Sequence, residues 1–151
     1  WFADGILIGT AQLERIDDVA VHINALAGTL EHDRLVVRIG DGAPTMRNRI
    51  VNCCLVRNFE VQLVDERKTS FGIRRHAHHA AAVRIARNKG RRVTERMPVS
   101  PTDGELREIK RRSRKHSNGR LTISSELAKA VAVGRLTMPE AIERQRLKNH
   151  R

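Results

Sequence analysis

The chain has 151 residues, of which 40% are apolar and only 3% aromatic, and it carries a formal net charge of +12. This length predicts one globular domain with at most a small appendage. No apolar run approaches the roughly 20 residues that span a bilayer, so we expect no membrane partner. The adjacent Cys53 and Cys54 lack metal-ligand spacing and are expected as reduced core residues, which favours a cytoplasmic protein.

The positive charge is unevenly distributed along the chain. Residues 1–83 hold ten lysines and arginines against ten acids, whereas residues 84–151 hold nineteen against seven. The second part therefore carries the whole excess, which predicts a polyanionic partner. Nucleic acid is favoured over a membrane, because no helix pairs its basic face with large aromatic side chains. The alternative is a solvated basic surface.

The first predicted elements are a hairpin and a helix. Asp4-Gly5 is a turn signal between two short apolar runs. Trp1 is no initiator residue and the first run is too short for a strand, so we expect the opening strand of the fold to be missing. A helix is predicted from Asp17 or Asp18, acting as cap, to a stop at Gly28.

Strands and helices then alternate. The apolar run 35–39 predicts a strand buried on both faces. Gly40–Pro44 breaks the chain, and Thr45 is expected to cap the next helix. A second buried strand is predicted over 59–64 and a helix over 73–88. This order predicts a mostly parallel sheet covered by helices, with ligands bound beyond the carboxyl ends of its strands.

The last third of the chain predicts helices after a linker over residues 91–101. Ser100 is expected to cap a helix that passes through the cationic run and stops at Asn118-Gly119. A short helix over 124–133 and a capping box opened by Thr137 follow. Residues 102–151 are therefore predicted to be a small basic helical appendage with little apolar content.

Three segments carry a family resemblance: "IGDGAPTMRNRIVN" (39–52), "VDERKTS" (64–70) and "RHAHHAAAVRIA" (75–86). In this order they resemble the RuvC/YqgF branch of the ribonuclease-H-like fold, which includes Holliday-junction resolvases and pre-ribosomal-RNA nucleases. The resemblance covers about residues 1–90. It implies an α/β fold with a ribonuclease-H-like mixed sheet flanked by helices. It also implies phosphodiester hydrolysis with bound Mg²⁺ or Mn²⁺.

The resemblance assigns roles to the second segment. Glu66 would be a catalytic carboxylate that ligates the metal, and Asp65 beside it would be structural. Arg67 and Lys68 would neutralise phosphate charge. Thr69 or Ser70 would bond a phosphate oxygen or cap the next helix.

Two departures from the family pattern concern the other metal ligands. The family's first carboxylate lies on an opening Asp-x-Gly strand that this sequence lacks. His79, or else His78, stands where the family has its last acid, so His79 would be catalytic and both histidines are candidate metal ligands. A solvated helix start is the alternative for His76 and these two residues. Asp41 is expected to order its loop by an Asx turn, with a metal role as the alternative.

Cations of the helical appendage are the predicted nucleic-acid contacts. They cover more than one face of their helix, so they cannot all form intrahelical ion pairs. The scarcity of aromatic residues disfavours single strands bound by base stacking and favours folded or double-stranded nucleic acid. The predicted contacts are Lys110, Arg111, Arg112, Arg114 and Lys115.

Two hypotheses follow. The first is a metal-dependent, structure-selective endonuclease acting on branched DNA or structured RNA, and a homodimer is a further implication because resolvases of this kind are dimers. The second is a catalytically decayed protein that binds ribosomal RNA or associates with the ribosome. The two differ in whether Glu66 is required.

Overall fold

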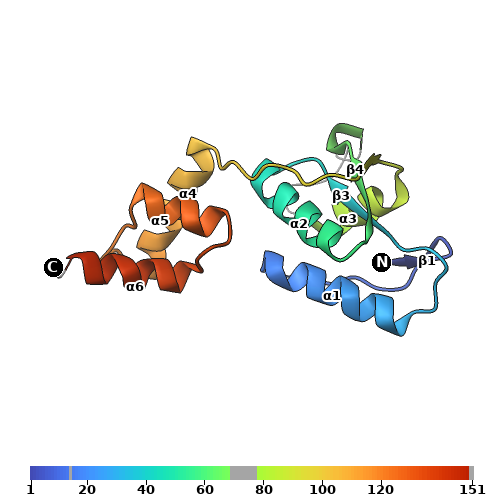
Figure 1. Ribbon diagram of the computed structural model, residues 1–151, viewed down its shortest axis with the longest axis horizontal. Coiled ribbons are helices and arrows are strands. Elements are labelled where there is room, and N and C mark those ends of the chain that lie inside the picture. Colours follow the sequence, from blue (N-terminus) through green and yellow to red (C-terminus); the bar gives the residue numbers. More distant parts are fainter. Residues whose placement is uncertain (14, 69–77, 150–151) are drawn as a thin grey trace. The chain divides into compact units, whose positions relative to one another are not determined.

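The computed structural model describes residues 1–13, 15–68 and 78–149. The chain forms two compact units, Trp1–Pro98 and Val99–Arg151, which we call the sheet unit and the helix bundle. Figure 1 shows both, with strands only in the first. In the described ranges no helix combines the length and the apolarity needed to cross a bilayer.

A three-stranded mixed sheet organises the sheet unit. It contains β3 (Val36–Gly40), β4 (Glu60–Val64) and β5 (Arg91–Val93), in the order β3-β4-β5. The strands β3 and β4 are parallel, and β5 runs antiparallel to β4. The predicted α/β class is therefore confirmed. The predicted linker is wrong over residues 91–93, because a strand with two exposed arginines and one buried valine lacks a readable apolar pattern.

Helices cover both faces of this sheet (Figure 1). The helices of the unit are α1 (Ile16–Thr29), α2 (Pro44–Val56) and α3 (His78–Arg87). Val37 packs against a cluster to which α2 contributes, whereas the guanidinium of its neighbour Arg38 donates to the carbonyl of Ala86 in α3. Because successive strand residues point to opposite faces, α2 and α3 lie on opposite sides of the sheet.

The core of the sheet unit lies between α2 and the sheet. Its buried members are Val51, Cys54, Val61, Leu63 and Val93. Both cysteines are free, and burial raises the pKa of the Cys54 thiol to about 11. By contrast, every residue of β3 is only half-buried. The prediction of a strand buried on both faces is wrong there, because β3 is an edge strand of the described sheet.

The starts of α1 and α2 differ from the predicted caps. The N-cap of α1 is Arg15, which makes no side-chain hydrogen bond to the helix. The two acids expected as caps lie in the first turn instead, where their negative charge interacts favourably with the helix dipole. The helix also continues past Gly28. The N-cap of α2 is Ala43, whose φ is 40°. The first helical residue is Pro44, whose ring already fixes the backbone angle that a helix needs. Thr45 is buried inside the helix.

A hairpin of β1 (Phe2–Ala3) and β2 (Ile6–Leu7) precedes these elements. Asp4 and Gly5 form its turn with φ of 49° and 80°, as the turn signal predicts.

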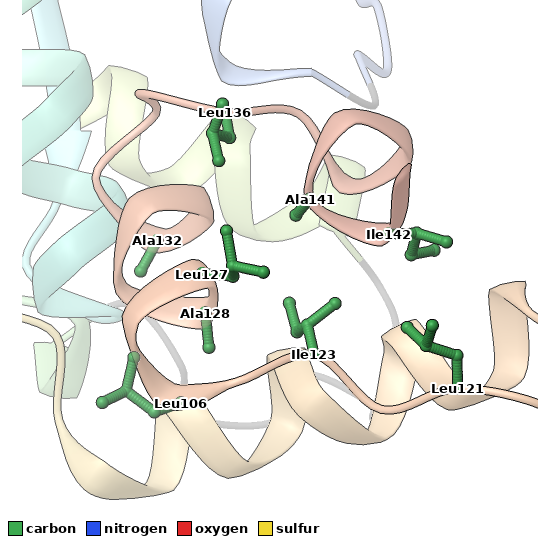
Figure 2. Close-up of a cluster of buried hydrophobic side chains, with 9 residues drawn as sticks. All are labelled: Leu106, Leu121, Ile123, Leu127, Ala128, Ala132, Leu136, Ala141 and Ile142. Carbon is green, nitrogen blue, oxygen red and sulfur yellow. The ribbon is translucent and has the colours of Figure 1, made fainter. Parts of the chain in front are cut away.

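The helix bundle consists of α4 (Asp103–His116), α5 (Ser125–Ala132) and α6 (Met138–Asn149). The prediction of little apolar content is wrong. The bundle has its own core, whose side chains come from all three helices and the connections between them (Figure 2). The pattern is inconspicuous in sequence because each helix contributes few residues. The buried members are Leu106, Leu121, Ile123, Leu127, Ala128, Ala132, Leu136, Ala141 and Ile142.

Side chains cap the bundle helices. Thr102, rather than Ser100, begins α4: its hydroxyl accepts the amide of Glu105 at 3.2 Å, and its own amide donates to that carboxylate at 2.8 Å. The predicted stop after α4 is confirmed, with positive φ at Asn118 and the residue that follows it. Thr137 forms the predicted capping box.

Candidate functional site

The carboxyl ends of the parallel strands form the candidate site. Gly40 lies opposite Val64, so the loops that follow both strands leave the same edge of the sheet. The amide of Asp41 donates to the carbonyl of Val64 at 3.0 Å, and its carboxylate accepts the amide of Glu66 at 2.9 Å. The glycine loop and the acidic segment are therefore held together, at the edge where the strand pattern predicted ligand binding.

The carboxylate of Glu66 lies over two glycines. A Cβ built at Gly42 would stand 2.7 Å from Oε2, and one at Gly40 would overlap Oε1. Any side chain at either position would displace the carboxylate. The glycines of "GDG" thus have a physical reason that the sequence did not reveal, which is to make room for a half-buried glutamate from the next strand.

Asp41 and Asp65, the other acids at this edge, both accept backbone amides. Asp41 orders its loop, as expected, but through the cross-loop bond to Glu66 rather than by a local Asx turn. Asp65 accepts the backbone amide of Arg67 at 2.9 Å and its guanidinium at 3.2 Å. Hydrogen bonding to Asp65 raises the pKa of Arg67, whose side chain is nevertheless 90% exposed. Lys68 ends the short 3₁₀ helix η1 (Glu66–Lys68).

The candidate histidines line an apolar cavity. His78 and His79 begin α3, are exposed, and border a cavity of about 550 Å³ together with Trp1, His22 and Met46. Within the described part of the chain, no group of three or more His, Cys, Asp and Glu side chains is placed to hold a metal ion. The structure thus does not gather these histidines and Glu66 into such a group. Thr69, Ser70 and His76 lie outside the described residues.

Two carboxylates at the sheet edge are candidate ligands, those of Asp41 and Glu66. Carboxylate oxygen is the ligand type that Mg²⁺ and Mn²⁺ prefer, and Mg²⁺ is commonly held by one or two carboxylates while it keeps several waters. The donor chemistry of the edge therefore fits a hydrated divalent cation, whereas the cavity beside the histidines is mostly apolar and its described lining includes no carboxylate.

The cationic run of the bundle lies on α4. Arg111 forms a fork with Glu108, with both contacts at 2.8 Å, which lowers the pKa of that carboxyl. Lys110 donates to the hydroxyl of Ser125 at 2.8 Å. Arg112 and Lys115 line a hollow of about 620 Å³ beside this ion pair.

Three of the five predicted contacts on α4 form no ion pair, although the charge of Arg112 adds to the effect of Arg111 in lowering the pKa of Glu108. No ion pair is found for Arg112, Arg114 or Lys115 among the residues that the structure describes, and all three are exposed. Arg114 and Lys115 lie in the last turn of α4, where positive charge interacts favourably with the helix dipole. Stabilisation of their own helix is therefore the alternative to a nucleic-acid contact for these two residues.

Comparison with known proteins concerns the bundle. Residues 102–148 match a family model described as a three helical bundle domain. The match agrees with the architecture of α4–α6 and leaves the sheet unit unassigned. No curated protein and no solved structure matches the chain.

Proposed function

We propose that the protein binds structured nucleic acid and cleaves a phosphodiester bond at the sheet edge with the help of a divalent cation. The supporting observation is the position of the Glu66 carboxylate, over two glycines at the carboxyl ends of two parallel strands. The proposal includes a ribonuclease-H-like arrangement of the mixed sheet, in which branched DNA or structured RNA is the substrate.

In this proposal different residues bind the cation and contact the phosphates. Glu66 and Asp41 hold the cation, which when bound supplies stabilisation of charge on the phosphate. Arg67 contributes an exposed positive charge three residues after the end of β4. Arg112 and Lys115 contact the phosphate backbone from the bundle and supply affinity rather than chemistry.

Replacement of Glu66 by glutamine tests the enzymatic part. Glu66→Gln keeps the shape of the side chain and removes its charge, so we expect cleavage of junction DNA or hairpin RNA in Mg²⁺ or Mn²⁺ to fall by about 100-fold or more with binding unchanged. The matched control is Glu31→Gln, which removes an exposed acid of the same unit. If the wild-type protein binds these substrates but cuts none of them with either ion, the enzymatic part is wrong.

Neutralisation of α4 tests the binding part. R112Q/K115Q should weaken binding and reduce the slope of log affinity against log salt by about 1.8, because each lost phosphate contact removes about 0.9. The control R120Q/R135Q removes two exposed bundle cations outside the hollow and should leave the slope unchanged. Equal effects of the two variants would show that only net charge matters.

A binding protein without catalysis is the second candidate. It is favoured by the lack of a three-ligand group within the described ranges. This candidate would bind ribosomal RNA or associate with the ribosome. It predicts co-sedimentation with ribosomal particles that is lost at high salt, and no effect of Glu66→Gln. A protein that stays at the top of a low-salt gradient would contradict it.

A further inference from the structure

The sheet unit carries a positive charge of its own. Residues 1–98 hold sixteen lysines and arginines against eleven acids, a net charge of +5. Residues 84–98 alone hold six against one, which is also +5. The sequence pattern joined this segment to the bundle, but the division of the chain at Pro98 assigns it to the sheet unit. The excess charge of that unit is thus confined to the end of α3, β5 and their flanking turns.

This segment lies at the edge of the sheet that holds Glu66. Arg91 is paired with Leu63, three residues before Glu66, which corresponds to at most about 10 Å along the strand direction. Gly90 packs so closely on β4 that a Cβ there would overlap the carbonyl of Leu63, and its amide donates to Gln62 at 3.3 Å. The turn that holds Lys89 is therefore fixed beside the carboxyl end of β4.

Two cations at the start of β5 are exposed and uncompensated. Lys89 and Arg91 form no ion pair with another described residue. Their neighbours are engaged: the guanidinium of Arg87 lies 5.3 Å from the ring centre of Phe2, and Arg92 acts on the carboxylate of Glu60. Arg96 is also exposed and forms no ion pair with a described residue, but it follows β5, at the end of the sheet where β4 begins. Near the carboxyl end of β4, the charge available for a partner is therefore concentrated on Lys89 and Arg91.

We propose that Lys89 and Arg91 form a second phosphate-contact surface, on the sheet unit, for the nucleic-acid backbone whose phosphodiester lies at Glu66. This inference rests on the proposed function. A duplex strand carries one phosphate per about 3.4 Å of helix axis, so a backbone at Glu66 has neighbouring phosphates within the span that separates it from these cations. Nucleic acid fits better than an acidic peptide, because its charges are regular and continuous over this distance.

A structural role makes a different prediction. β5 is an edge strand of the described sheet. In the structural alternative, the exposed cations at this strand prevent edge-to-edge pairing with another chain and do not contact nucleic acid. Removal of the charges would then cause self-association and would leave the affinity of the monomer for nucleic acid unchanged.

The experiment compares two double variants of equal charge. K89Q/R91Q removes the proposed contacts. R15Q/R57Q removes two exposed cations of the same unit, one at the N-cap of α1 and one at the C-cap of α2, just before β4. Binding to duplex RNA and to a DNA junction is measured by anisotropy between 50 and 200 mM salt, with circular dichroism to verify folding. We expect K89Q/R91Q to bind about 10- to 100-fold more weakly, with a salt slope lower by about 1.8, and R15Q/R57Q to resemble the wild type.

The charge-conserving variant K89R/R91K should retain wild-type affinity and slope. If K89Q/R91Q matches R15Q/R57Q in both quantities, the second surface is wrong, and self-association of K89Q/R91Q with unchanged binding assigns these cations to edge protection. If the wild-type protein binds no nucleic acid at 50 mM salt, the proposed function itself fails. The two failures are thereby distinguished.

Discussion

The sheet unit and the helix bundle differ in how their structure is encoded. Bundle helices begin at side chains that cap them within a few residues, as Thr102, Ser124 and Thr137 do. The first two helices of the sheet unit have no side-chain cap bond. The bundle is thus specified largely by neighbours in sequence, which explains why its helix boundaries, apart from the start of α4, are readable from the sequence.

Long-range contacts replace local signals in the sheet unit. Asn52 in α2 exchanges two hydrogen bonds of 2.8 Å with the backbone of Met97, and Asn48 donates to the carbonyl of Pro98 at 2.6 Å. These amides fix the segment after β5 across 45 residues or more of sequence. The sheet unit therefore has a clear strand–helix pattern, but the ends of its elements depend on contacts with residues that are distant in sequence.

The largest expected effect separates the two cores. Ile123→Ala removes a side chain that is 1% exposed in the centre of the bundle, so we expect the bundle to lose about 2–5 kcal/mol of unfolding free energy, measured by urea denaturation. Leu147→Ala, at 59% exposure, is the control and should change stability by less than about 0.5 kcal/mol. Hydrogen exchange at Val61 should be unaffected by Ile123→Ala. Equal loss of protection there would show that the two cores are not independent.

Alkaline pH should destabilise the sheet unit through Cys54. Burial raises the pKa of its thiol from 9.0 to about 11, so the unfolded chain loses this proton first and binds fewer protons than the native state. The unfolding free energy should therefore fall by about 2 kcal/mol as the pH rises from 9 to 11. Cys54→Ala should remove this part of the pH dependence. If both proteins show the same slope over that range, the thiol makes no such contribution.

A buried hydroxyl tests the connection between α4 and α5. The hydroxyl of Ser113, in a fully buried residue, donates to the carbonyl of Lys110 at 2.7 Å and accepts the amide of Ile123 at 3.1 Å. Ser113→Ala leaves that amide without a partner, and we expect a loss of about 2 kcal/mol in urea denaturation. Thr122→Ala, which removes the hydroxyl of an exposed residue in the same connection, should have little effect. Equal losses would contradict the assignment.

The smallest effect concerns helix capping and compares the units directly. Thr102→Ala removes the cap of α4 and should cost about 1 kcal/mol of unfolding free energy. Arg15→Ala changes an N-cap that makes no side-chain hydrogen bond, so its effect on denaturation should lie within about 0.5 kcal/mol. A similar cost for both would remove the distinction between locally and distantly specified helices.

The structural features that were predicted correctly are those that depend on residues close together in the sequence. The alternation of strands and helices, the turn at Asp4, the end of α4 near Asn118 and the capping box of Thr137 all follow from residues a few positions apart. The order of the strands also placed the glycine loop and the segment of Glu66 at one edge, because parallel strands end on the same side of their sheet.

The features that depend on pairing between distant segments became visible in the tertiary structure alone. The strand β5, the cross-loop bond of Asp41, the glycine cradle of Glu66 and the place of Arg91 beside it could not be read from local pattern. The register between strands is set by contacts over tens of residues. A basic segment adjacent to the bundle in sequence therefore belongs, in space, to the sheet.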